Sequence, residues 1–370
     1  MHAWIQAVID VLIVVMASIL VLFVLALVIL HILTTTNNKQ VERIKRRIMR
    51  MLSVTQDLDF LRGQIMRLLA HEDGIAGLRD IRGIRSNRGT IAMTLVVEEV
   101  PAEQKEALRE IILADEWYLA HIHRRMASSN ADRVGVFTKL IAELRLPGFE
   151  QDIIRELRRW PKRADNQEIG LLALFMCGCE DELVELLGDS SFRLIISFRS
   201  LQELFVQYTG NKAALYRRLL RQECDLYITR ACIRGIGVDG LEELCEDVLP
   251  YLESTNTNLL IDAVRTLGKL RYAPAVEAIR AFTRHEAWTV RSTAASALFD
   301  AAPESCRDDL LRCLCDSEWW VRFHAAEALS ALPNPPDLET DIAPLDDRFA
   351  YEMYRFMLER NALLAEGKAS

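Results

Sequence analysis

The stretch Trp319–Leu329, which reads WWVRFHAAEAL, repeats the pattern of Trp288–Leu298, which reads WTVRSTAASAL, 31 residues earlier. Both stretches start with tryptophan, continue with Val-Arg and end in paired alanines followed by a final Leu. Two columns of apolar residues continue upstream at the same spacing: Ile228, Leu259, Val290 and Val321, and Ile236, Leu267, Leu298 and Leu329. A fixed period of this length indicates a chain built from one repeated supersecondary unit.

A second set of apolar residues lies between these stretches in the same register, at Val248, Ile279 and Leu310. Each unit is therefore expected to be a helix, a short turn and a second helix. Pro274 falls where the first turn of a helix accepts proline. A single helix pair cannot bury its apolar stripe, so neighbouring pairs must stack. The pattern predicts an all-α fold, an α-solenoid of helical hairpins.

The residues Asp316-Ser317-Glu318-Trp319-Trp320-Val321-Arg322, followed by the paired alanines and Ala328-Leu329, resemble HEAT repeats, in particular the short HEAT-like repeats of the phycobilin-lyase type. The preceding unit has His285 where the family has Asp, and the two earlier units have Leu260 and Thr229 where it has Arg. The resemblance covers roughly residues 255–332. It implies a structural polar ladder between repeats, formed by Arg291, Asp316 and Arg322.

Helical patterns extend upstream of the clear repeats, and we expect the solenoid to occupy residues 101–335. The segments concerned are Ala131–Leu144, Phe149–Trp160, Gln167–Met176 and Phe192–Tyr208. Residues 336–370 are expected to form an acidic, Pro-rich linker and a final helix, Arg348–Glu366. We expect this helix to cap the open end of the solenoid, since terminal repeats need a covered face; docking on a partner is the alternative. Its apolar side would carry Phe349, Met353, Phe356, Met357 and Leu364.

The N-terminal segment, residues 1–35, contains the most apolar stretch of the chain. Val11–Leu30 is twenty residues without a charge, and Ser18 is its one polar member. A helix of this length spans roughly 30 Å, the thickness of the hydrocarbon core of a bilayer. The core is too long for a signal peptide, and no Lys or Arg precedes it. The segment therefore predicts one transmembrane helix. All nearby basic residues follow it, which places the N-terminus outside and the rest of the chain in the cytoplasm.

Residues 36–100 are expected to form a basic amphipathic juxtamembrane helix and a linker. In Lys39–Leu52, basic residues alternate with apolar ones at helical spacing. This helix is expected to lie on anionic headgroups; alternatively, it continues the membrane helix and packs on a partner. Leu58–Leu69 indicates another short helix, and Gly83–Gly89 a break. Thr90–Val97 is expected to be helix or extended linker, because a single strand cannot stand alone.

Charge and motif content exclude several functional classes. The net charge of −8 argues against a general nucleic-acid binder. His121 and His123, like the pairs Cys177/Cys179 and Cys313/Cys315, are two positions apart, so on a helix they point about 200° apart and cannot chelate one ion. Nucleotide-binding and hydrolase motifs are missing. We therefore expect no catalytic residue, cofactor, metal or small-molecule substrate, and free buried cysteines suited to a reducing compartment.

Two groups of residues are candidates for binding a protein partner. Trp288, Trp319 and Trp320 begin successive second helices; they are expected to fill the groove between repeats, or else to form an aromatic ridge that anchors a partner. Arg155, Arg158 and Arg159 form a basic patch near Trp160, which is either a solvated face or a contact for acidic lipid or an acidic partner.

These features together predict a membrane-anchored cytoplasmic scaffold that binds and positions a partner protein. The layout resembles bacterial HEAT proteins found alongside membrane-embedded glycosyltransferases that build cell-surface polysaccharide, which implies such a complex as the partner. Two alternatives stay open: a bilin-lyase-like enzyme, implied by the repeat type, and a cytoplasmic sensor or regulator of a membrane system.

Overall fold

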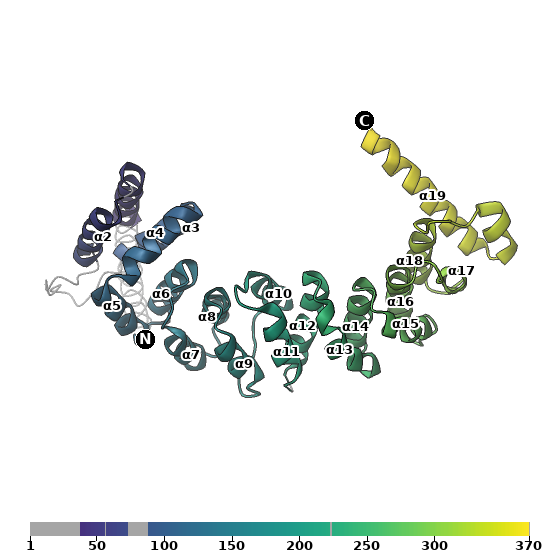
Figure 1. Cartoon of the computed structure of the whole chain (residues 1–370), viewed down its shortest axis with the longest axis horizontal. Helices are drawn as coiled ribbons and strands as arrows, with labels where there is room; N and C mark the ends of the chain where they lie inside the picture. The colour runs from purple at the N-terminus through teal and green to yellow at the C-terminus, as the bar shows by residue number, and fades with distance from the viewer. Residues whose placement is uncertain (1–37, 56, 73–87, 223, 370) are drawn as a thin grey trace, which may run out of the picture. The chain divides into compact units, whose positions relative to one another are not determined.

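The structure, a computed structural model, describes residues 38–55, 57–72, 88–222 and 224–369 (Figure 1). Within these ranges the chain is all-α, with no strand. It divides into two compact units, Met1–Ala173 (unit 1) and Leu174–Ser370 (unit 2). The predicted span Val11–Leu30 lies outside the described residues. Of the helices that are described, none combines the length and the apolar character needed to cross a membrane.

Unit 1 is a bundle of short helices. The first is helical over residues 38–54. It is followed by α2 (Leu58–Glu72), α3 (Arg88–Glu99), α4 (Ala102–Leu113), α5 (Glu116–Met126), α6 (Ala131–Leu144), α7 (Glu150–Arg159) and the larger part of α8 (Ala164–Cys177). Helix α2 packs on α3 and α4, and α6 packs on α3 and α5. The helices expected at Leu58–Leu69 and Ala131–Leu144 are present.

The basic helix over residues 38–54 is amphipathic, as expected. Its apolar residues Val41, Ile44, Ile48 and Leu52 are buried. On its polar side, Lys45 forms an ion pair of 2.6 Å with Glu99 of α3. The protein itself therefore covers the apolar face, and only the basic face is left for a membrane or a partner. That face has a shallow groove lined by Lys39, Arg43, Arg46, Arg47 and Arg50.

Thr90–Val97, expected to be helix or extended linker, lies within helix α3. Met93, Val96 and Val97 are buried, and Glu98 pairs with Lys139 of α6. Burial outweighs the weak helix preference of β-branched residues here, because propensity is readily overridden by tertiary packing. The expected break at Gly83–Gly89 falls mostly outside the described residues, and its last residue is already in α3.

Unit 2 contains a row of paired helices (Figure 1). They are α9 (Glu180–Gly188), α10 (Phe198–Gln207), α11 (Lys212–Leu220), α12 (Leu226–Asp239), η1 (Glu242–Leu244), α13 (Cys245–Val248), η2 (Leu249–Glu253), α14 (Thr257–Lys269), η3 (Ala273–Ala275), α15 (Val276–Phe282), α16 (Trp288–Ala301), α17 (Arg307–Leu314), α18 (Trp319–Ser330), η4 (Leu338–Ile342), η5 (Ala343–Leu345) and α19 (Arg348–Ala369). The helix expected over Phe192–Tyr208 is shorter than predicted. It begins only at Phe198, where the Ser197 hydroxyl accepts a hydrogen bond of 3.0 Å from the Ser200 backbone N–H.

The 31-residue period is the structural repeat of unit 2. Helices α10, α12, α14, α16 and α18 pack each on the next, and α11, α15 and α17 pack against them as the other member of each pair. All residues of both apolar columns are buried, and so are Val248, Ile279 and Leu310. Pro274 lies in the first turn of η3, as predicted. The prediction of stacked HEAT-like hairpins is confirmed in this region.

The turn before each second helix repeats one hydrogen bond that the apolar pattern does not reveal. Residues 254, 285, 316 and 347 are 31 apart and are a serine, a histidine and two aspartates. Each side chain nevertheless accepts a bond from the backbone N–H two residues later, at distances of 2.9–3.1 Å; the acceptors are Ser254, His285, Asp316 and Asp347. The repeat therefore continues to the start of α19, because three kinds of side chain at four equivalent positions satisfy the same orphan donor.

Close approach between repeats explains why Gly268 is a glycine. A Cβ added at this position of α14 would lie 2.5 Å from the Cβ and 2.8 Å from the carbonyl oxygen of Ala297 in α16. We expect Gly268→Val to lower the unfolding free energy of unit 2 by about 2 kcal/mol through overpacking. Gly135→Ala is the control, because its Cβ would meet Asn166 at an ordinary 3.8 Å. Urea unfolding curves check both; equal midpoints for the two variants would contradict the packing argument.

Helix α19 packs on α18 and α17, so it covers the end of the repeat row. The prediction of which side of α19 is buried is only partly confirmed. Met353 and Met357 are buried, together with Ala350 and Tyr354, whereas Phe349, Phe356 and Leu364 are exposed. The buried face is thus rotated from the predicted one, because the Tyr354 hydroxyl reaches inward to the Pro336 carbonyl at 2.8 Å and brings its own face against the protein.

Candidate partner-binding surface

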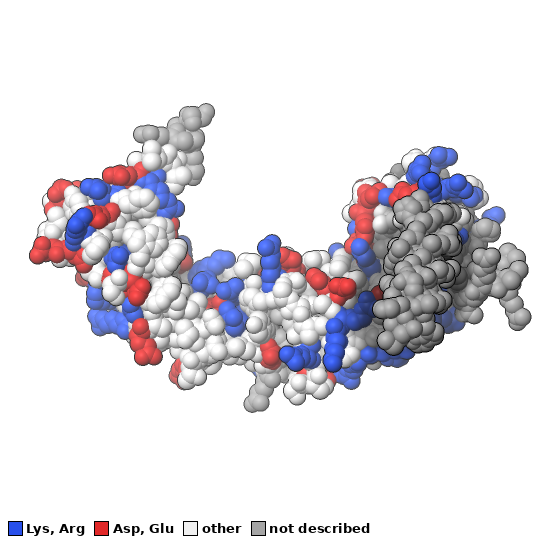
Figure 2. Space-filling view, turned by 180° about the vertical axis from the view of Figure 1, so that it is seen from behind, with Lys and Arg blue, Asp and Glu red and all other residues white. Residues whose placement is uncertain are grey.

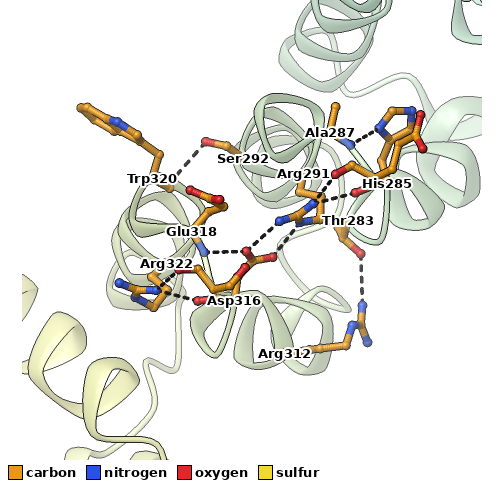
Figure 3. Close-up of polar contacts among 12 residues, drawn as sticks. Thr283, His285, Ala287, Arg291, Ser292, Arg312, Asp316, Glu318, Trp320 and Arg322 are labelled. Carbon is orange, nitrogen blue, oxygen red and sulfur yellow. Dashed lines mark hydrogen bonds and ion pairs between the residues drawn. The ribbon is translucent and has the colours of Figure 1, made fainter.

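The arginine–aspartate ladder implied by the HEAT resemblance links α16 to the turn before α18 (Figure 3). Arg291 grips Asp316 with two hydrogen bonds, Nε to Oδ2 at 2.7 Å and Nη2 to Oδ1 at 2.9 Å. The Arg291 Nη1 atom donates to the carbonyls of His285 and Glu286, both at 2.8 Å. One guanidinium therefore ties its own turn to the turn of the next repeat, with the two-pronged geometry that makes such pairs strong.

Arg322 repeats half of this arrangement one unit later. Its Nη1 atom donates to the carbonyls of Asp316 and Ser317, at 2.7 and 2.8 Å. The residue that would complete the rung is Asp347, but its carboxylate accepts hydrogen bonds from the backbone N–H groups of Phe349 and Ala350 at the start of α19. Arg322 instead lies over the ring of Phe349, with 5.3 Å between guanidinium carbon and ring centroid. The ladder ends here, and a cation–π contact takes the place of its last ion pair.

The electrostatics of the ladder favour the charged pair. Burial opposes ionisation of Asp316, but hydrogen bonds from Arg291 and from the Glu318 backbone outweigh it, so the pKa of Asp316 is lowered. The hydrogen bond to Asp316 likewise raises the pKa of Arg291. The two side chains are largely buried, with 15% and 13% exposed. The turns that carry the tryptophans are thus held by a charged, largely desolvated link.

The three tryptophans do not fill the groove between repeats, which was the favoured expectation. Trp288, Trp319 and Trp320 are 40%, 45% and 50% exposed. They occupy the first turns of α16 and α18, and the buried alanines Ala294, Ala295, Ala325 and Ala326 follow further along these helices. The small residues of each helix therefore face the interior, whereas the rings remain partly at the surface.

The exposed rings of Trp319 and Trp320 form one cluster with the half-buried ring of Phe323, and we call these three residues the aromatic cluster. Ring centroids lie 4.7 Å apart for Trp319 and Trp320, at 90°, and 5.0 Å apart for Trp319 and Phe323, which are stacked. His324 stacks on Trp320, and Arg360 of α19 lies over Phe323. Phe323 was not among the predicted residues. Its position four residues after Trp319, on the same helix face, is the signal that could have found it.

The predicted basic patch is present on α7 as a shallow groove lined by Gln151, Ile154, Arg155, Arg158 and Arg159. Its charges are partly used inside unit 1. Arg155 pairs with Asp152 at 2.6 Å, and Arg159 donates to the Ser128 carbonyl while lying over the ring of Trp160. The tryptophans belong to unit 2 and this patch to unit 1. On the face shown in Figure 2, Lys and Arg are interspersed with Asp and Glu over the described residues.

His121 and His123 point apart on α5, as the helix geometry predicts, but neither cysteine pair lies within one helix, because α8 ends at Cys177 and α17 ends at Leu314. His121 is buried against Tyr118 and Phe137, whereas His123 pairs with Asp152 at 2.6 Å. Across the described ranges, no group of three or more His, Cys, Asp or Glu is placed to hold a metal. Contrary to expectation, the cysteines are not all buried: Cys315 is exposed, and Cys177 and Cys224 are half-buried.

One comparison with known proteins supports the repeat architecture. Residues 276–355 match the family model described as HEAT repeats. This part of unit 2 is therefore of the HEAT-repeat class. No curated protein matches the chain. Among solved structures, an engineered protein matches at 14% identity over 85% of this chain and 88% of its own, with a TM-score of 0.32, too low to support any argument.

Proposed function

We propose that this protein is a membrane-anchored HEAT-repeat scaffold that binds a partner protein through the aromatic cluster and holds it at the membrane. The observation that carries the proposal is the exposure of Trp319 and Trp320 beside Phe323 at the start of α18. Monomeric surfaces rarely expose such groups together without a binding role. HEAT repeats generally mediate protein–protein interactions, and the repeat class here agrees with that role.

The physical argument rests on preorganisation. Trp and Tyr provide large contact areas at low entropic cost, and they dominate binding energy at interfaces. The Arg291–Asp316 pair fixes the turn before Trp319, and Arg322 fixes the same turn from the other side. Little side-chain or backbone freedom is lost when a partner contacts rings that are already held, so more of the contact energy appears as affinity.

The membrane part of the proposal rests on sequence and charge. Val11–Leu30 has the length and composition of a span, and the groove of Lys39, Arg43, Arg46, Arg47 and Arg50 follows it closely in the chain. Each basic residue near anionic headgroups contributes on the order of 1 kcal/mol. We propose an outside N-terminus and cytoplasmic repeats. The partner would be membrane-associated, with a glycosyltransferase complex for cell-surface polysaccharide as the specific case to test.

We further propose a binding role without catalysis. Burial raises the pKa of Cys313 to about 12 and the pKa values of Cys224 and Cys245 to about 11. Partial burial of the thiol also raises the pKa of Cys315, although the residue as a whole is exposed. Reactive cysteines depend on a lowered pKa. These four thiols therefore do not favour the bilin-lyase alternative, and adding a bilin to the protein should leave no covalently bound visible absorbance.

The double variant Trp319→Ala/Trp320→Ala tests the proposed surface. We expect it to reduce recovery of the stoichiometric membrane partner at least tenfold on purification in mild detergent, because anchor residues of this kind contribute about 2 kcal/mol or more each. Mass spectrometry of the co-purified proteins is the measurement. The fold should be retained, since both rings are half exposed.

Trp117→Ala is the matched control, because Trp117 is also 45% exposed but lies on α5 in unit 1. We expect this variant to recover the partner as the unmodified chain does. Equal recovery with the double variant would remove the aromatic cluster from the proposal. Recovery of no stoichiometric membrane protein by the unmodified chain would contradict the scaffold function itself.

A further inference from the structure

A second polar cluster of unit 2 lies on α12 and α14 and is built around one buried carboxylate. The side chain of Asp262 is fully buried. The Nε atoms of Arg230 and Arg234 each donate to one of its oxygens, at 2.7 Å. Because both arginines use Nε, their four terminal Nη groups have no hydrogen-bond partner in the part of the chain that the structure describes. The Arg230 and Arg234 side chains are 17% and 31% exposed, so these groups are held near the surface.

A third guanidinium joins the same carboxylate. Arg265 lies 3.7 Å from Asp262, too far for a hydrogen bond, and its side chain is 54% exposed. Over the described residues, Asp262 is the one carboxylate within ion-pair distance of these three arginines, so three positive charges face one negative charge. Burial first, and then the charge of Arg234, lowers the pKa of Arg265. The cluster thus carries an excess of about two positive charges in a chain whose net charge is −8.

Arg230 and Arg234 are also held in position by an aromatic ring. Arg230 and Arg234 both lie over the ring of Phe198 on α10, with 5.0 and 5.2 Å from guanidinium carbon to ring centroid. The rest of the repeat does not require this arrangement. The residues 31 positions after Asp262 and Arg265 are Thr293 and Ser296, so the next unit has neither charge. The HEAT ladder, by comparison, pairs Arg291 with Asp316 one to one.

We propose that the Arg230–Arg234–Arg265 cluster binds the carboxylates of an acidic segment of the partner protein. The planar guanidinium group matches a carboxylate geometrically. The Nη groups of Arg230 and Arg234 are held over the ring of Phe198, so they are preorganised to donate two hydrogen bonds to one carboxylate. The inference rests on the proposed function for its partner. Arg265 and His324 line one groove across α14, α16 and α18, and His324 stacks on Trp320, so we expect one bound chain to contact both this cluster and the aromatic cluster.

The test uses the full-length protein in detergent and a fluorescein-labelled peptide of ten glutamates, with fluorescence anisotropy as the readout. We expect saturable binding that weakens as salt increases. The double variant Arg234→Ser/Arg265→Ser should weaken it at least tenfold. Serine is the natural residue at the equivalent position 296, so the repeat accepts it. The single change Arg265→Glu should also weaken binding. Because Arg265 is half-exposed, this change leaves the hydrogen bonds of Arg230 and Arg234 to Asp262 in place.

The matched control is Arg221→Ser/Arg348→Ser, which removes two charges from side chains of unit 2 that are 70% and 83% exposed. This variant should change the affinity less than twofold, and a peptide of ten glutamines should not bind. Equal weakening by both double variants would mean non-specific attraction and would overturn the proposal. So would displacement of the peptide by millimolar inorganic phosphate alone, or arginine-dependent binding of phosphatidylglycerol vesicles in place of the peptide. Because the assay needs no natural partner, its failure is distinct from failure of the scaffold function.

Discussion

Asp316→Ala is expected to destabilise unit 2 by about 3 kcal/mol, because it breaks a largely buried ion pair from one side. The change leaves the Arg291 guanidinium without its carboxylate, and an uncompensated buried charge of this kind typically costs about 3–5 kcal/mol. It also removes the acceptor for the Glu318 backbone N–H. Urea unfolding of the full chain, followed by hydrogen exchange of peptides from α16 and α18, measures the loss.

Glu352→Gln is the control for this prediction. Its pair with Arg348 has the same kind of hydrogen bond, at 2.8 Å, but the two side chains are 45% and 83% exposed. Exposed pairs of this type contribute less than about 0.5 kcal/mol.

The pH dependence of unfolding gives a second check on the contribution of Asp316. Because the pKa of Asp316 is lowered in the folded state, its contribution is present above the unfolded value near 4 and is lost as the pH falls through the folded value. A loss centred near neutral pH would contradict the assignment.

The second large effect concerns His121 and the acid stability of unit 1. Burial, with the nearby charges of Arg125 and Arg124, lowers the pKa of His121 from 6.5 to about 4. The neutral ring accepts a long hydrogen bond from Arg125, at 3.4 Å, which the protonated ring could not accept. Between pH 6.5 and 4 the unfolded chain binds a proton that the folded chain does not. Stability should therefore fall by about 3 kcal/mol on acidification across this range, and change little from this group below it.

His121→Phe isolates this effect, because phenylalanine keeps an aromatic ring beside Tyr118 and Phe137 without a titrating nitrogen. The comparison is needed since Glu156, also in unit 1, acts in the opposite direction: burial raises its pKa, so acidification relieves its buried charge. Unfolding free energies at pH 7 and pH 4, from exchange in α5 and α6, should differ less in the variant than in the unmodified chain. An unchanged difference would mean that the folded and unfolded chains protonate His121 equally, and would contradict the lowered pKa.

The repeat architecture could be predicted because its cause is periodic. Residues such as Val290 and Val321 are buried by equivalent neighbours, so one spacing in the sequence reports the same packing in several places. Unit 1 does not show that repeated spacing, so its packing cannot be predicted from equivalent positions. Helix α3 carries β-branched residues that suit a strand locally, and its packing against α2 and α6 outweighs that preference. The helix predicted over Phe192–Tyr208 was too long, because the helical pattern of the sequence continues across a turn that ends at Ser197, the N-cap of α10.

The candidate surface was predicted only in part, for a related reason. The tryptophans were visible in the repeat, but their exposure was not, because exposure depends on what fills the space beside them. The cluster of Arg230, Arg234 and Arg265 could not be found from sequence, since its members are spread over two helices and converge on Asp262 only when α12 packs on α14. Charge counting alone treats them as ordinary surface residues.

By itself, the sequence determined the helical repeat, its 31-residue period and the residues of its core, because burial of an apolar face requires regular spacing along each helix. Only the tertiary structure decided which side of α19 faces inward, which aromatic rings remain at the surface and which guanidiniums share one carboxylate. Those outcomes depend on distances between atoms far apart in the chain, and such distances exist only after the helices have packed.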